Sequence, residues 1–268
     1  MAQQRQLEIA DQRAATPRLR WLTLHAPEIT RAVRAGQYLL VRCAEEGSYD
    51  PLLRRALFVA AAEPALGQVG LLYEPNERGL AWLARGRSGD VLDVIGPLGR
   101  PFDVEERTRT LLLVGAGMGL PALLLLARES VAKGRAVTLL AGAADIAALP
   151  PPFLLPGEVE YQSIAGLQIA DFRLQIDPTA AQSIIYNLQS AIGWADQICV
   201  ALPGDQLPAL RDAIRVVKFR WERGFASVLL EGPLVCGVGA CGVCAVDLRR
   251  GTRMLCSDGP VFDLRDLG

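Results

Sequence analysis

The sequence has a single histidine, His25, and only two lysines, Lys133 and Lys218. One histidine leaves little room for a Ser-His-Asp or Cys-His catalytic arrangement, and it excludes most histidine-based metal sites. Excess charge is also missing, because 28 basic and 29 acidic residues give a net charge of −1 and a pI near 6.0. This balance gives no support for nucleic-acid binding. If the chain is an enzyme, we expect cofactors to carry its chemistry.

The sequence also lacks a recognisable targeting segment and a convincing membrane span. The N-terminal stretch 1–9 has no apolar core of a signal peptide. The stretch Leu111–Ala127 is uncharged and mostly apolar, but it is short for a membrane span and has three glycines and Pro121 at its centre. A buried strand, a glycine turn and a buried helix explain it better. We therefore predict a cytoplasmic protein that binds neither membrane nor nucleic acid.

The apolar content of 51% is enough for real cores, and 268 residues allow two or three domains. Residues 1–103 have the pattern of an all-β domain. Five β-rich runs recur between turn signals: Arg20–Leu24, Gln37–Arg42, Ala56–Ala60, Val69–Tyr73 and Asp90–Ile95. A helical segment at 79–85 interrupts them. Strands of this length and spacing predict a small antiparallel barrel.

Residues 104–225 change to the pattern of an α/β domain with a parallel sheet, because apolar strands alternate with helices. The predicted strands are Thr110–Val114, Ala136–Ala141 and Gln197–Leu202, and the predicted helices are Pro121–Lys133 and Gln206–Arg223. Residues 226–268 form a cysteine-rich segment that is too small to hold itself together without a metal group. The sequence therefore predicts an α+β protein of three parts: 1–103, 104–225 and 226–268.

A glycine-rich turn, Gly115-Ala-Gly117-Met-Gly119, links the first strand of the α/β part to the following helix. Such a turn lets a phosphate approach the N-terminus of a helix. Leu120 occupies the sixth position of G-x-G-x-x-G, so the dinucleotide fingerprint is incomplete. Two interpretations stay open: a nucleotide-binding turn, or a tight strand-to-helix turn with close packing.

Four cysteines near the C-terminus are the most informative residues of the sequence. Cys236, Cys241, Cys244 and Cys256 have the spacing C-x4-C-x2-C-x11-C. The C-x4-C-x2-C run is the spacing of plant-type ferredoxins, whose thiolates hold a [2Fe–2S] cluster. We therefore predict that these four cysteines ligate iron.

The residues around these cysteines favour the same prediction. Gly237, Gly239 and Gly242 suit a loop that wraps a cluster, because such a loop needs positive φ and points N–H groups at the sulfurs. The serious alternative is a four-cysteine zinc site, but zinc ribbons usually have two C-x2-C knuckles and this segment has one. Disulfides do not suit an intracellular chain. Cys43 and Cys199 lie in apolar strand-like runs and are expected to be buried small hydrophobes.

The order of barrel, nucleotide-like domain and ferredoxin-type segment resembles the electron-transfer subunit of the NAD-dependent class of dihydroorotate dehydrogenase. That family lies in the ferredoxin reductase-like superfamily. The tightest match is the cysteine run followed by Leu255-Cys256-Ser-Asp-Gly-Pro-Val-Phe262, because the short gap before the last cysteine is specific to this group. The match continues through 50–55, 89–99 and 114–119, and so covers nearly the whole chain.

The resemblance implies FAD in the barrel, NAD(H) against the second domain and a [2Fe–2S] cluster near a partner. Electrons would run from NADH through FAD and the cluster to FMN in a separate catalytic subunit, or in the reverse direction. That catalytic dehydrogenase subunit would oxidise dihydroorotate to orotate in pyrimidine biosynthesis. The expected complex is a heterotetramer with two copies of each subunit.

Five departures from the family pattern fall at nucleotide contacts. The flavin motif Arg-Pro-x-Ser is Arg-Ala-Leu-Phe at 55–58, so a phenyl ring replaces a hydroxyl, and Leu-Tyr-Arg at 72–74 ends in an anion instead of a phosphate-pairing cation. Gly-Thr is Gly-Leu at 79–80, after an arginine that could compensate. A Thr-Asp-Asp-Gly-Ser stretch is not recognisable near 162–166, and Cys-Gly-Pro is replaced at 201–204. The cofactor-binding candidates are Arg55, Ala56, Leu57, Phe58, Leu72, Tyr73, Glu74, Gly79, Leu80, Gly115, Gly117 and Gly119.

Two functions remain open. The first is an NADH-dependent electron-transfer subunit, an architecture shared with the diaphorase subunits of hydrogenases and of flavin-based transhydrogenases. The second is a non-catalytic [2Fe–2S] wire or scaffold, which the altered flavin contacts favour. In either case Arg55 is the best remaining ligand for a flavin phosphate, and Tyr73 packs against the cofactor or in the barrel core. We assign no catalytic residue.

Overall fold

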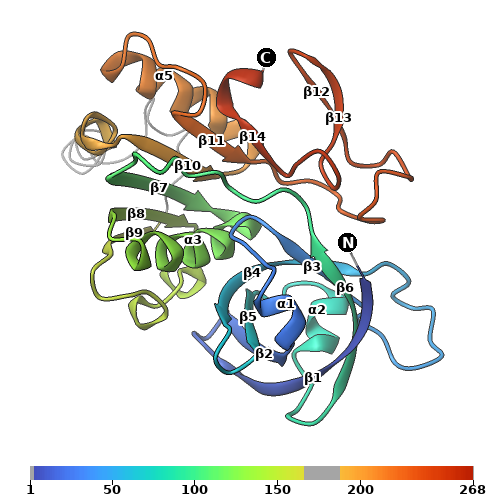
Figure 1. Cartoon of the computed structure of the whole chain (residues 1–268). Coiled ribbons are helices and arrows are strands. Elements are labelled where there is room, and N and C mark those ends of the chain that lie inside the picture. Colours follow the sequence, from blue (N-terminus) through green and yellow to red (C-terminus); the bar gives the residue numbers. More distant parts are fainter. Residues whose placement is uncertain (1–2, 166–187, 268) are drawn as a thin grey trace.

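The computed structural model describes residues 3–165 and 188–267 of the chain. Figure 1 shows a barrel built from the N-terminal part, an α/β part beside it, and a C-terminal segment that lies along both. All six cysteines and all cofactor-binding candidates lie within the described ranges. Residues 166–187 of the predicted second domain lie outside the described ranges. They include residue 166, the last of the stretch 162–166 in which the family's Thr-Asp-Asp-Gly-Ser motif is not recognisable.

Six antiparallel strands close into the predicted barrel, in the order β1-β2-β5-β4-β3-β6. The strands are β1 (Gln3–Ala14), β2 (Arg20–His25), β3 (Tyr38–Val41), β4 (Arg55–Glu63), β5 (Gln68–Tyr73) and β6 (Val91–Leu98). Alternate side chains face inward, and Leu22, Leu39 and Leu71 are fully buried there. Two short helices, α1 (Pro27–Thr30) and α2 (Arg78–Leu83), lie in the connections.

The α/β part is a six-stranded sheet in the order β14-β11-β10-β7-β8-β9. Five of its strands are parallel: β7 (Thr110–Ala116), β8 (Ala136–Ala143), β9 (Glu160–Ala165), β10 (Gln197–Ala201) and β11 (Ala226–Leu229). Short 3-10 turns are η1 (Gly117–Gly119), η2 (Ile146–Ala148), η3 (Pro152–Leu154) and η5 (Gly204–Gln206). The predicted fold class, with an antiparallel barrel and a parallel-sheet domain, is confirmed.

Helices cover both faces of the described sheet. The helix α3 (Leu120–Ala132) lies between the sheet and strand β4 of the barrel, and α5 (Leu207–Val217) lies on the opposite face (Figure 1). The helix α5 is shorter than the predicted 206–223, because Lys218 adopts an extended backbone that ends it. The apolar stretch 111–127 forms β7, η1 and the start of α3, as predicted. Among the helices within 3–165 and 188–267, none has the length and apolar character to cross a membrane.

The C-terminal segment is tied to both other parts. Strands β12 (Ala245–Leu248) and β13 (Gly251–Met254) form a hairpin, while β14 (Val261–Asp263) pairs antiparallel with β11 and is followed by η6 (Leu264–Asp266). The backbone N–H of Arg100, just after β6, donates to the carbonyl of Gly259 at 2.5 Å. The cysteine loop is therefore held between the barrel and the sheet. The boundaries at 103 and 225 stay predictions.

Candidate cofactor sites

The four C-terminal cysteines lie on one loop system between β11 and β14. Cys244 and Cys256 are buried, Cys236 is half-buried and Cys241 is exposed. The Sγ atoms of Cys244 and Cys256 are 3.3 Å apart, and the thiol of Cys236 interacts with that of Cys241. The hairpin β12-β13 explains the first of these pairs, because it brings the chain back from Cys244 to Cys256.

Backbone N–H groups of the loop point at the sulfurs. The N–H of Gly239 donates to Cys256 Sγ at 3.1 Å. The N–H groups of Val238 and Cys241 are the main reason that the pKa of Cys236 is lowered to about 6. Burial raises the pKa of Cys256 to about 12, and the adjacent Cys244 thiol adds to the rise. The loop thus supplies donors for thiolate sulfur in the manner expected of an iron–sulfur site.

Glycines give the loop its shape, as the sequence predicted. Gly237, Gly239 and Gly242 have φ of +74°, +74° and +72°, a region that side-chain-bearing residues rarely adopt. A Cβ on Gly237 would lie 2.7 Å from Cδ1 of Leu98, at the end of β6. A Cβ on Gly242 would meet no atom within 4 Å. Gly237 therefore also allows the loop to approach the barrel closely.

The arrangement of the thiols fits two irons better than one zinc. A zinc site needs four ligands around one ion, each about 2.3 Å from it for sulfur. The cysteines instead form two pairs, Cys236 with Cys241 and Cys244 with Cys256. In a [2Fe–2S] cluster each iron takes two protein ligands, so these residues fit that group.

Sequence reasoning missed Tyr38, which faces the cysteine loop from β3. Its side chain is fully buried, and its hydroxyl has no hydrogen-bond partner among the described residues. Burial raises its pKa, and the charges of Cys256, Cys244 and Cys236 raise it further, which places the phenol in their electrostatic field. A Cβ on Gly99 would contact both the Tyr38 ring and Pro260 of the cysteine segment, so the ring lies close to that segment. An apolar strand run gives no sign of such a contact, because the loop lies about two hundred residues further along.

Three of the predicted flavin-site residues converge on one anion. The Arg55 side chain donates through Nε to Oε1 of Glu77 at 2.9 Å and through Nη2 to Oε2 at 2.7 Å. The N–H groups of Gly79 and Leu80 donate to the same carboxylate, at 3.0 and 2.6 Å. The predicted phosphate ligands therefore do come together. Glu77, which the sequence analysis did not select, already binds all of them.

Glu74, the anion at the position of the family's phosphate-pairing cation, forms an ion pair: Nη2 of Arg18 lies 2.5 Å from its Oε1. Arg78, the expected compensating cation, pairs instead with Asp50 at 2.8 Å. Both interactions join residues far apart in the sequence, so sequence patterns could not reveal them.

The remaining barrel candidates mostly pack in the core. Leu57, Phe58, Leu72 and Tyr73 are buried, while Ala56 is half-buried. The ring of Phe58 meets that of Tyr38 edge-on, with centroids 5.8 Å apart. The phenyl ring that replaces the expected hydroxyl thus serves the packing between β3 and β4.

The glycine turn also holds a carboxylate. The N–H of Gly119 donates to Oε1 of Glu231 at 2.8 Å. Gly117 has φ of +74°, and a Cβ on it would lie 2.8 Å from the same carboxylate. Burial raises the pKa of Glu231. A Cβ on Gly115 would clash with Leu120 at 2.5 Å, so this glycine allows strand and helix to pack closely.

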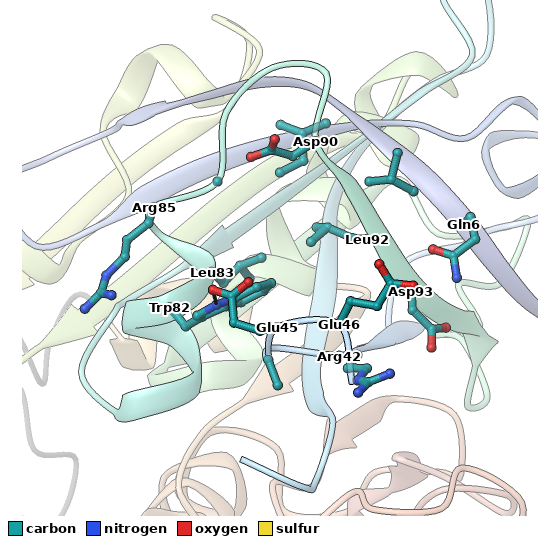
Figure 2. Close-up of a pocket in the computed structure, with 14 residues that line it drawn as sticks. Gln6, Arg42, Glu45, Glu46, Trp82, Leu83, Arg85, Asp90, Leu92 and Asp93 are labelled. Carbon is teal, nitrogen blue, oxygen red and sulfur yellow. Dashed lines mark hydrogen bonds between the residues drawn. The ribbon is translucent and has the colours of Figure 1, made fainter. Parts of the chain in front are cut away.

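A cavity of about 610 Å³ opens beside α2. Figure 2 shows its carboxylates, Glu45, Glu46, Asp90 and Asp93, with Arg42 and Arg85 as the lining cations, and the indole N–H of Trp82 donating to Glu45. None of the cofactor-binding candidates lines this cavity. Its acidic wall does not suit a pyrophosphate.

The barrel and the parallel sheet together form the fold of ferredoxin reductase-like proteins. One solved structure with this fold is an NADH-dependent reduced ferredoxin-NADP oxidoreductase studied for flavin-based electron bifurcation. It superposes with a TM-score of 0.73 at 21% identity, over 98% of this chain and 89% of that one. Phthalate dioxygenase reductase, described as a modular structure for electron transfer from pyridine nucleotides to [2Fe–2S], gives a TM-score of 0.61 at 17% identity, over 94% of each chain.

Sequence comparison gives the family. Residues 231–268 match the iron–sulfur cluster binding domain of dihydroorotate dehydrogenase B. The electron transfer subunit of dihydroorotate dehydrogenase B (NAD(+)) from Shouchella clausii is 34% identical over 92% of this chain and 91% of its own length. The corresponding subunit from Bacillus caldolyticus is 31% identical over 96% and 95%. The chain belongs to this family of electron transfer subunits, as the sequence predicted.

Proposed function

We propose that this chain transfers electrons between NAD(H), FAD and a [2Fe–2S] cluster, and passes them to or from a catalytic dehydrogenase subunit. The observation that carries the proposal is the paired set of four cysteines, on a glycine loop that supplies N–H donors to sulfur. The family relationship over nearly the whole chain supports it.

The proposed sites follow from the residues already described. Cys236, Cys241, Cys244 and Cys256 would hold the cluster, while Arg55 would contact the FAD phosphates. The turn at 115–119 would face NAD(H). When bound, the flavin accepts two electrons from the nicotinamide and the cluster carries one at a time. The protein's own contribution is to hold the cluster loop against the barrel, through Gly237 and Leu98.

The proposed partner is an FMN-containing catalytic subunit that oxidises dihydroorotate to orotate in pyrimidine biosynthesis. The names of the relatives support a catalytic partner. A heterotetramer with two copies of each subunit, and a cytoplasmic location, are the finer parts of this proposal.

A [2Fe–2S] wire or scaffold without nucleotide turnover is the second candidate. Two internal carboxylates favour it, because Glu77 pairs with Arg55 and Glu231 binds the glycine turn. A diaphorase subunit of a hydrogenase or transhydrogenase has the same architecture and differs only in its partner.

The deciding experiment mixes the purified chain with the catalytic subunit and measures NAD+ reduction driven by dihydroorotate. The proposal predicts reduction that needs both proteins and added FAD. Iron-loaded protein that binds the catalytic subunit, but supports no NAD+ reduction at saturating FAD, would establish the wire or scaffold instead.

We expect Tyr38→Phe to lower the reduction potential of the cluster. Among the described residues the buried Tyr38 hydroxyl has no hydrogen-bond partner, and the loop cysteines act on it electrostatically. We expect it to donate to a cluster sulfur in the loaded protein, and such hydrogen bonds stabilise the more negative reduced form. The expected fall in reduction potential is on the order of 50 mV, close to the about 59 mV that corresponds to a tenfold change in the equilibrium constant of a one-electron reduction. Redox titration followed by electron paramagnetic resonance measures it.

Tyr73→Phe is the matched control for this variant. The Tyr73 hydroxyl is also buried without a partner among the described residues, but burial and the thiol of Cys43, not the four loop cysteines, raise its pKa. We expect no change of cluster potential in this variant. Equal potentials in Tyr38→Phe and the wild type would contradict the assignment of Tyr38.

A further inference from the structure

We propose that the Glu77 carboxylate is an internal competitor for the FAD phosphates, which must displace it from Arg55 in order to bind. The inference rests on the proposed function only in taking FAD as the ligand of the barrel. It assigns to Glu77 a role in setting flavin affinity.

The donor set around Glu77 has the geometry of an anion site. The guanidinium of Arg55 meets the carboxylate with two parallel donors, at 2.9 and 2.7 Å. This two-pronged geometry is the one that arginine uses for phosphate as well as carboxylate. The N–H groups of Gly79 and Leu80 complete four donors directed at a single two-oxygen anion.

The backbone is shaped to bring these donors together. A Cβ on Gly79 would lie 2.8 Å from Cζ and 2.9 Å from Nε and Nη2 of Arg55. Only glycine therefore lets the guanidinium lie directly against this part of the chain. Since Arg55 comes from β4 and Gly79 from α2, the cradle joins two separate elements of the barrel.

Glu77 occupies this cradle as a charged group. The hydrogen bond from Arg55 is the main reason that its pKa is lowered to about 2. The carboxylate is therefore ionised at neutral pH. A pyrophosphate and this carboxylate cannot accept from the same four donors, and two anions this close would repel one another.

Three other arginines of the barrel part are already in ion pairs. Arg18 pairs with Glu74 at 2.5 Å, Arg54 with Asp93 at 2.6 Å and Arg78 with Asp50 at 2.8 Å. An incoming pyrophosphate must therefore break an existing ion pair wherever it seeks one of these cations. The Arg55–Glu77 pair is the one at which backbone donors also converge.

The test measures the dissociation constant of FAD for cluster-loaded protein, by quenching of flavin fluorescence. Glu77→Gln removes the charge, and Glu77→Ser keeps a short oxygen that can still cap α2 while freeing Arg55. Asp93→Asn is the matched control, because it breaks the ion pair of Arg54, the residue that precedes Arg55 in the sequence. Thermal unfolding checks that each variant is folded.

We expect Glu77→Gln and Glu77→Ser to bind FAD roughly tenfold or more tightly than the wild type, a change that corresponds to about 1.4 kcal/mol. Asp93→Asn should stay within about twofold of the wild type. Adding Arg55→Ala to Glu77→Ser should abolish the gain. Unchanged or weaker FAD binding in both Glu77 variants, or a gain in Asp93→Asn as large as theirs, would overturn the proposal.

The same samples separate this proposal from the proposed function. Tighter FAD binding by the Glu77 variants, without NAD+ reduction in the presence of the catalytic subunit, supports the competitor role and contradicts the relay. NAD+ reduction by the wild type, with FAD affinity unchanged in both Glu77 variants, supports the relay and overturns the competitor role.

Discussion

Cys256→Ser should lose the cluster. Iron content is expected to fall from about two per chain to well below one, and the visible charge-transfer bands should disappear. Cys256 is 1% exposed, its sulfur lies 3.3 Å from that of Cys244, and it accepts the N–H of Gly239. A serine oxygen is a harder and weaker ligand for iron than a thiolate. Iron analysis and absorption spectra of anaerobically purified protein measure the effect.

Cys43→Ser is the control for this substitution. Cys43 is fully buried in the barrel, and its thiol donates to the carbonyl of Val41 at 3.6 Å, a bond that a serine hydroxyl can also make. It lies outside the cysteine loop 236–256, and burial raises its pKa to about 12. We expect this variant to keep its iron. Iron loss in Cys43→Ser equal to that in Cys256→Ser would show that the assay reports folding and not ligation.

Gly237→Ala should destabilise the cluster-loaded protein by roughly 2–5 kcal/mol. About 1–2 kcal/mol comes from placing a side chain at φ of +74°. About 1–3 kcal/mol more comes from overpacking, because the new Cβ would lie 2.7 Å from Leu98 and 3.2 Å from Leu40. For a protein of this size the melting temperature should fall by about 5–15 °C. Calorimetry of the iron-loaded protein measures it.

Gly242→Ala separates the two causes. Gly242 has nearly the same φ, +72°, but a Cβ there meets nothing within 4 Å. We expect a loss of only about 1–2 kcal/mol. If the two variants lose the same stability, the contact of the cysteine loop with the barrel contributes nothing, and Gly237 matters only for its backbone angle.

The sequence was sufficient for the elements that carry strong local patterns. Apolar alternation predicted β2 to β6, and continuous apolar runs predicted β7, β8 and β10. Strand β1 was missed because only Leu7 and Ile9 of its twelve residues are buried, so it lacks a clear alternating core face. The edge strands β9 and β14 were missed for a related reason: β14 is three residues long and half-buried throughout.

The residues of the candidate sites also separate into those that local sequence patterns predict and those that depend on distant partners. The cysteine spacing and the loop glycines are local in sequence, so their chemistry could be predicted. Glu77, Tyr38 and Glu231 could not, because each acts through a partner distant in the chain: 22 residues separate Glu77 from Arg55, and 112 separate Glu231 from Gly119. Ion pairs and buried hydroxyls of this kind depend on how the barrel, the sheet and the loop meet.

The most direct test of the whole account is the absorption spectrum of anaerobically purified protein, with iron, zinc and flavin assays on the same sample. The account predicts about two irons per chain, the broad bands of a [2Fe–2S] cluster and flavin bands near about 450 nm once FAD is added. Zinc without iron would contradict it, because the four cysteines would then be a structural site and the chain could not transfer electrons through them.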